Sequence, residues 1–131
     1  MSKIDWLTKL NWSDEQIDEL RITGYAYIRQ GKYEIALSFF EALELLDPES
    51  AYDAQTLGAL YLQLGNPAKA LPHFERALKL ETDHSPTLLN LAKALLLLGR
   101  KEEGLRLANV LKNEKDSSIA NTANALLLAY S

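Results

Sequence analysis

The chain has no cysteine among its 131 residues, which excludes a disulfide framework and a zinc site built on thiolates. It also lacks any run of 18 apolar residues free of charge, so the sequence predicts no membrane-spanning helix. No apolar run precedes a small-residue cleavage site near the N-terminus, so we expect no signal peptide. Together these absences predict a cytoplasmic protein.

An excess of positive charge is missing too. The formal net charge is −4, which gives no electrostatic footprint for nucleic acid. Residues 1–50 hold ten acidic and five basic side chains, whereas residues 51–131 hold eight and nine. The acidic character of residues 1–50 predicts either a surface that orients a partner or an ordinary solvated helix face.

Signatures of catalysis are absent as well. His73 and His84 are eleven residues apart, which is not the spacing of metal ligands. Glu102 and Glu103 are adjacent in a predicted helix, where neighbouring side chains point apart. The sequence has no glycine-rich phosphate loop, nucleophile elbow or kinase signature. We therefore expect no enzyme activity, no cofactor and no metal.

The sequence does contain a repeat with a period of 34 residues. Small, aromatic, glycine and phenylalanine positions recur in the same order in each copy, with some replacements in the third. The equivalent sets are Gly24, Gly58 and Ala92; Tyr27, Tyr61 and Leu95; Gly31, Gly65 and Gly99; Ala36, Ala70 and Gly104; and Phe40, Phe74 and Ala108. A fixed period of this length is typical of a stacked helical array.

Helical periodicity and end signals divide each repeat into two helices. Ser13 and Gln16 predict a capping box, Asp47-Pro48 predicts a helix end, and Ser85-Pro86 predicts a cap followed by a proline in the first turn. The predicted helices cover about residues 14–30, 33–46, 50–64, 67–80, 86–98, 101–112 and 119–129. A further short helix is predicted from the apolar spacing of Ile4, Trp6, Leu7 and Leu10.

At the repeated positions the chain resembles the tetratricopeptide-repeat family, over residues 20–112. The resemblance implies an all-α fold, a right-handed superhelical stack of three helix-turn-helix repeats. We assign an N-terminal helical extension to residues 1–16 and a C-terminal capping helix to residues 117–131. The three repeats lie between them, at about residues 17–49, 50–83 and 84–116.

The resemblance also implies that the first helix of each repeat lines a concave groove. The positions that map onto it are Arg21, Tyr25, Ile28 and Arg29, then Tyr52, Gln55, Ala59, Leu62 and Gln63, then Leu89, Lys93, Leu96 and Leu97. Such an aromatic and aliphatic surface is typical of an interaction site, and suits an extended segment or an amphipathic helix. The alternative is that the leucines of the third repeat only pack on the last helix.

Two further features bear on the partner. Members of the family that bind chaperone tails use a clamp of lysine, arginine and asparagine, whereas the matching positions here hold Arg21, Tyr25, Thr56, Pro86 and Asn90. A carboxyl-terminal acidic peptide is therefore not the expected ligand. Ser117–Ser131 carries no charged side chain. This segment is either a docked cap with Asn121 and Asn124 outward or a contact with another chain.

Residues 24–36 and 39–48 carry a second resemblance, to the tetratricopeptide chaperones of bacterial type III secretion. It implies a cytoplasmic chaperone that masks a client protein, either a translocator or a needle subunit, bound as a helix or as an extended segment. The alternatives are a general assembly scaffold without a secretion role and a regulatory repeat domain of a larger enzyme system. A homodimer or a co-chaperone contact through the N-terminal or C-terminal helix is also a hypothesis.

Overall fold

The computed structural model describes residues 12–131, and all the regular structure in this range is helical. The helices are α2 (Asp14–Arg29), α3 (Tyr33–Leu46), α4 (Ala51–Gln63), α5 (Pro67–Leu80), α6 (Ser85–Leu97), α7 (Lys101–Leu111) and α8 (Ser117–Tyr130). Their bounds lie within about two residues of the predicted ones. The short helix predicted over residues 4–10 lies outside the described residues.

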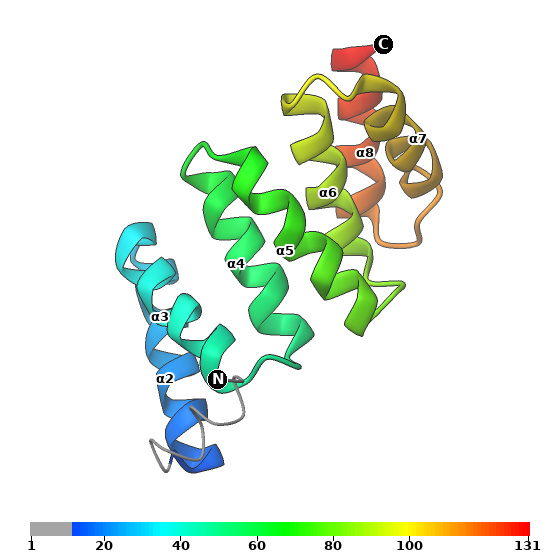
Figure 1. Cartoon of the computed structure of the whole chain (residues 1–131). Coiled ribbons are helices and arrows are strands. Elements are labelled where there is room, and N and C mark those ends of the chain that lie inside the picture. Colours follow the sequence, from blue (N-terminus) through cyan, green and yellow to red (C-terminus); the bar gives the residue numbers. More distant parts are fainter. Residues whose placement is uncertain (1–11) are drawn as a thin grey trace.

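Consecutive helices pair as hairpins, and the hairpins stack in sequence order. The pairs α2–α3, α4–α5 and α6–α7 follow one another across Figure 1, and α8 lies against the last pair. In the described part of the chain, α8 contacts only α6 and α7. The structure is thus the all-α stack of three helical hairpins with a terminal helix that the repeat predicts.

Glycine ends the first helix of each hairpin, as predicted. Gly31, Gly65 and Gly99 have φ angles of 75°, 81° and 80°, in the left-handed region that favours glycine. After α2, the amide of Gly31 donates to the carbonyl of Ile28, and the next amide donates to Tyr27. This pair of bonds is a Schellman cap, which satisfies the last carbonyl groups of the helix.

Side-chain caps are present at the starts of α2, α4, α5 and α8. The capping box at α2 is confirmed, because the Gln16 amide donates to Ser13 Oγ over 3.1 Å and the Ser13 amide donates to Gln16 Oε1 over 2.9 Å. The predicted cap of α6 is corrected by one residue, since His84 is the N-cap and Ser85 is the first helical residue. The Ser85 hydroxyl instead donates to Glu114 Oε1 over 2.8 Å, so it ties α6 to the segment before α8.

Glycines within the helices let the two members of each hairpin approach closely. A Cβ atom added to Gly58 would lie 2.6 Å from Phe74 Cε1, and one added to Gly24 would lie 2.8 Å from Phe40 Cε2. Both phenylalanine rings are fully buried. In the third hairpin the glycine lies on the second helix instead: a Cβ on Gly104 would lie 2.6 Å from the Cγ atom of Leu96. In this close contact the small residue is therefore on the second helix, α7, and the large residue is on the first helix, α6.

The terminal helix closes the apolar end of the stack. Ile119 and Ala123 of α8 are buried together with Leu89, Ala108 and Leu111 of the third hairpin. Asn121 and Asn124 are exposed, as expected for a docked cap. Leu128 is 84% exposed, so α8 also presents one large apolar side chain to solvent.

Candidate functional site

Several of the predicted groove residues gather around one hollow between α2 and α4. We call this cavity of about 350 Å³ the aromatic hollow, and its lining residues are Tyr25, Ile28, Tyr33, Tyr52, Gln55, Thr56, Ala59, Leu60 and Gln63. Six of the nine were predicted from the sequence. Tyr33, Thr56 and Leu60 were not, since Tyr33 begins the second helix of its repeat and the other two are buried or nearly so. No lining side chain carries a formal charge at neutral pH.

Two tyrosines dominate the aromatic hollow. Tyr25 is 48% exposed and Tyr52 is 43% exposed, so both rings reach solvent while parts of them pack on the protein. The Tyr52 ring meets Phe40 edge-on, with centroids 6.3 Å apart, which fixes its orientation. Burial of the phenol raises the pKa of Tyr52 above its ordinary value. The neutral hydroxyl can donate a hydrogen bond.

A neighbouring cavity shares two of these residues. We call it the second hollow; it has a volume of about 240 Å³ and is lined by Ala51, Tyr52, Gln55, Ala77, Glu81, His84 and Thr87. Tyr52 and Gln55 of α4 form the wall common to both hollows. The ring nitrogen Nδ1 of His84 lies 2.7 Å from the hydroxyl oxygen of Thr87, so these two polar groups are already paired.

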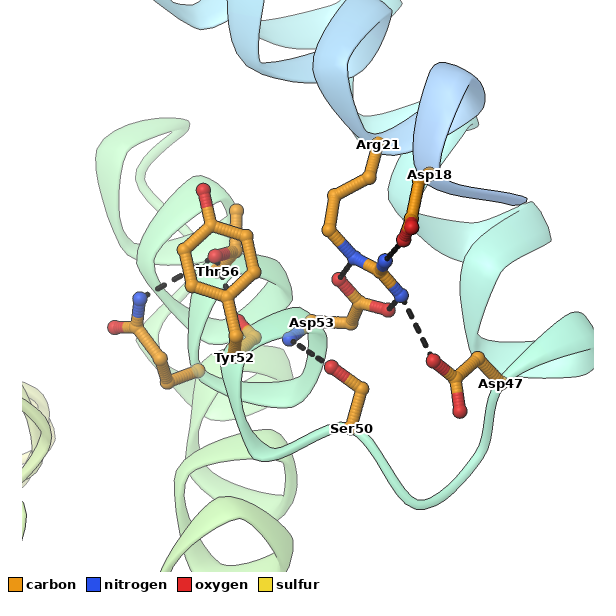
Figure 2. Close-up of polar contacts among 8 residues, drawn as sticks. Asp18, Arg21, Asp47, Ser50, Tyr52, Asp53 and Thr56 are labelled. Carbon is orange, nitrogen blue, oxygen red and sulfur yellow. Dashed lines mark hydrogen bonds and ion pairs between the residues drawn. The ribbon is translucent and has the colours of Figure 1, made fainter. Parts of the chain in front are cut away.

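Arg21 has a different role from the one expected. Figure 2 shows its guanidinium directed at the carboxylates of three aspartates, Asp18, Asp47 and Asp53. Nε and Nη2 each donate to a carboxylate oxygen of Asp53 over 2.7 Å, while Nη2 also reaches Asp47 over 2.8 Å and Nη1 reaches Asp18 over 2.6 Å. The hydrogen bonds to Asp53 are the main reason why the pKa of Arg21 lies above its ordinary value. Arg21 therefore serves as a link between helices and is not available as a free donor.

Two predicted groove residues of the third repeat are buried instead. Leu89 packs in the cluster that α8 covers, and Leu96 lies beneath Gly104 of α7. The physical reason is that α6 contacts α5, α7, α8 and α4, so most of its apolar side chains are covered. For Leu89 the structure agrees with the alternative that the third-repeat leucines pack on the last helix.

The remaining predicted residues are dispersed. Leu62 packs partly buried beside Phe74, and Lys93 is half-buried on α6. Arg29 is exposed and lines a further hollow with Ile22 and Tyr25, so Tyr25 is shared between this hollow and the aromatic hollow. Leu97 is exposed near the end of α6. The structure thus concentrates the candidate site on α2 and α4, and extends it toward α6 through the second hollow.

Within residues 12–131, no group of three or more histidine, aspartate or glutamate side chains has an arrangement that could hold a metal ion. None of the helices described is both long enough and apolar enough to cross a membrane.

A stack of helical hairpins, joined by small-residue contacts and hollowed along its first helices, defines a helical repeat protein. The sequence profile of the tetratricopeptide-repeat family matches residues 16–106. The chain belongs to this family.

Solved structures with the same fold include two chaperones. PcrH, crystallised in complex with the chaperone binding region of PopD and known from Pseudomonas aeruginosa, is 25% identical, with a TM-score of 0.79 over 91% of this chain and 93% of that one. The type III secretion chaperone SycD of Yersinia enterocolitica, in complex with a peptide of the translocator YopD, is 24% identical, with a TM-score of 0.79 over 90% and 94% of the two chains.

Curated relatives are much longer. The human protein O-mannosyl-transferase TMTC2 is 36% identical over 89 residues, which cover 64% of this chain and 10% of that protein. The chain spans one tenth or less of the length of the curated relatives that it matches first.

Proposed function

We propose that this protein is a non-enzymatic chaperone that binds an apolar or amphipathic segment of a client protein along α2 and α4. The proposed client is a substrate of type III secretion, and the proposed compartment is the cytoplasm. A translocator is the client of first choice, because SycD was crystallised with a translocator peptide. A needle subunit is the second choice.

The aromatic hollow is the observation that carries this proposal. It is open, uncharged and walled by Tyr25 and Tyr52, whose rings offer large apolar surfaces together with a hydroxyl. Within residues 12–131 the terminal helix contacts neither α2 nor α4, so it leaves the hollow free for a guest. Burying apolar client surface there contributes roughly 25 cal/mol per Å² and hides that surface from self-association.

In the proposed mechanism the chaperone covers an apolar segment of the client and does not alter it chemically. A specific complex of standard size buries about 800 Å² on each partner, more than one hollow provides. The client segment is therefore expected to continue past the aromatic hollow along the same face. An extended segment and an amphipathic helix both meet this requirement.

A paired variant tests the proposal. Tyr25→Ala with Tyr52→Ala removes both rings, and since both are nearly half exposed, the helical content should stay unchanged. Leu45→Ala is the matched control, because Leu45 is 45% exposed and lines neither hollow. Each variant is co-expressed with the products of the neighbouring genes, one at a time, and the soluble fraction of each product is measured.

The expected result is one product that is insoluble alone and soluble with the wild type or the control, but not with the paired variant. A client that stays soluble with the paired variant would exclude the aromatic hollow as the binding site.

The alternative is a general scaffold for a multiprotein assembly. The match to one tenth of a much longer relative supports this alternative. In that case the neighbouring products should be soluble on their own, and they should join the chain in a complex of three or more different proteins.

A further inference from the structure

We propose that the second hollow accepts a lysine or arginine side chain of the bound client segment, while an apolar side chain of the same segment fills the aromatic hollow. This inference rests on the proposed function and specifies the client's chemistry. It assigns a recognition role to Glu81, a residue that the sequence did not single out.

The two hollows lie side by side across α4. Because Tyr52 and Gln55 belong to both linings, a segment that leaves the aromatic hollow over α4 enters the second hollow. The two hollows lie on either side of α4, and a helix with its side chains is about 10–12 Å across. An extended segment advances about 3.3 Å per residue, so the apolar and cationic side chains should be about three to four residues apart.

The lining of the second hollow matches a long cationic side chain. Ala51 and Ala77 offer small apolar walls for the methylene stem of a lysine or arginine. Glu81 supplies a carboxylate, and within residues 12–131 it has no ion pair. The volume of about 240 Å³ accommodates one side chain rather than a drug-sized ligand.

The charge around Tyr52 favours a cation as well. The adjacent cluster holds three carboxylates, of Asp18, Asp47 and Asp53, against the single guanidinium of Arg21. Two negative charges are therefore not neutralised within the cluster, and Asp18 is exposed to solvent. Because Glu81 lines the second hollow together with Tyr52, the surroundings of Tyr52 carry net negative charge, which attracts lysine or arginine and repels an acidic segment.

A random peptide library of 12-residue segments displayed on phage tests the inference without a known client. The full chain is the target in four forms: wild type, Glu81→Gln, the control Glu75→Gln, and the paired Tyr25→Ala/Tyr52→Ala variant. Glu75 is exposed on α5, the helix that ends just before Glu81, and it lines neither hollow, so its substitution removes the same charge from elsewhere.

We expect the wild type and Glu75→Gln to select apolar residues with a lysine or arginine about three to four positions away. Glu81→Gln should keep the apolar preference and lose the cationic one. For a synthetic peptide of the selected sequence, Glu81→Gln should weaken binding about threefold, as for a partly exposed ion pair. This difference should shrink at about 1 M ionic strength, where the Debye length is about 3 Å.

The outcomes separate the two proposals. In one outcome, the paired variant abolishes the apolar selection, but the wild type shows no cationic preference. In another, the cationic preference exists but Glu81→Gln leaves it intact. Either outcome would overturn the role of the second hollow alone. No apolar selection by the wild type, or selection that the paired variant leaves unchanged, would overturn the proposed function and the inference with it.

Discussion

Arg21 holds Asp53 through two parallel hydrogen bonds, and this pair joins the first hairpin to the second. Asp53 is 2% exposed, so its charge is almost completely removed from water. Among the described residues no Cα atom of α2 comes within 8 Å of one of α4, so side chains alone connect these two helices. The ion pair in Figure 2 is the polar part of that connection.

Arg21→Met should therefore destabilise the fold. It leaves a buried carboxylate without its partner, which costs about 3–5 kcal/mol for a buried pair. The free energy of unfolding in urea is the measurement. The double variant Arg21→Met/Asp53→Leu should recover much of the loss, since an apolar pair carries no desolvation penalty. Equal losses in the single and double variants would contradict this account.

Gly58→Ala should also destabilise, although alanine is the better helix former by about 1 kcal/mol. The added methyl group would lie 2.6 Å from Phe74 Cε1, and overpacking of this kind costs about 1–3 kcal/mol. Thermal unfolding of Gly58→Ala, Phe74→Leu and the double variant tests the contact. A favourable coupling in the double variant is expected, and strict additivity would contradict a direct clash.

Because the pKa of the Tyr61 phenol is raised in the folded state, we expect the fold to lose stability at alkaline pH. Its ring stacks on His73 with centroids 5.4 Å apart, and its hydroxyl donates to Glu41 Oε1 over 3.2 Å. Burial, and then the charge of Glu41, raise the pKa of Tyr61 above its ordinary value of 10.0. The folded state thus favours the neutral phenol, and this contribution is complete below about pH 10 and is lost as the pH rises through the folded-state pKa.

Two variants test this pH dependence by urea unfolding at pH values from 8 upward. Tyr61→Phe should make the loss of stability above about pH 10 less steep than in the wild type, since one phenol no longer titrates. Glu41→Gln should have a smaller effect in the same direction, because only the second cause of the shift is removed. An unchanged slope in Tyr61→Phe would contradict the assignment.

Removal of residues 117–131 should expose the apolar end of the stack. Ile119 and Ala123 of α8 bury Leu89 and Leu111, and burial of one such side chain contributes about 1.5–3 kcal/mol. The shortened chain should therefore unfold at a lower urea concentration and bind more of a hydrophobic dye. Leu128→Lys is the control, since this side chain is 84% exposed and its replacement should change stability by at most about 0.5 kcal/mol.

The fold was largely predictable because its determinants are local. Left-handed glycines such as Gly65, and close pairs such as Gly58 with Phe74, recur at a fixed period, so each repeat supports the reading of the others. The exchange of small and large residues between Leu96 and Gly104 was not predictable in this way, since the pattern identifies small positions but not the side chains that fill them.

The candidate site was less predictable because it depends on contacts between repeats. Arg21 maps to the groove by its register, but its partner Asp53 lies 32 residues away and no local signal joins them. On α6 an almost continuous apolar surface conceals which leucines face a neighbour, so Leu89 was assigned to the open face although it is buried. Glu81 lies after the end of α5, outside the first helices of the repeats, on which the groove residues were predicted.

The separation of α2 and α4 has a mechanical consequence. A wall of the aromatic hollow belongs to each helix, and the distance between those walls is set by α3, by the ion pair of Arg21 and by apolar side chains of both helices in one core cluster. The width of the aromatic hollow therefore depends on the angle between the first hairpin and the second. A change in that angle would alter the width available to a client segment without any rearrangement inside either hairpin.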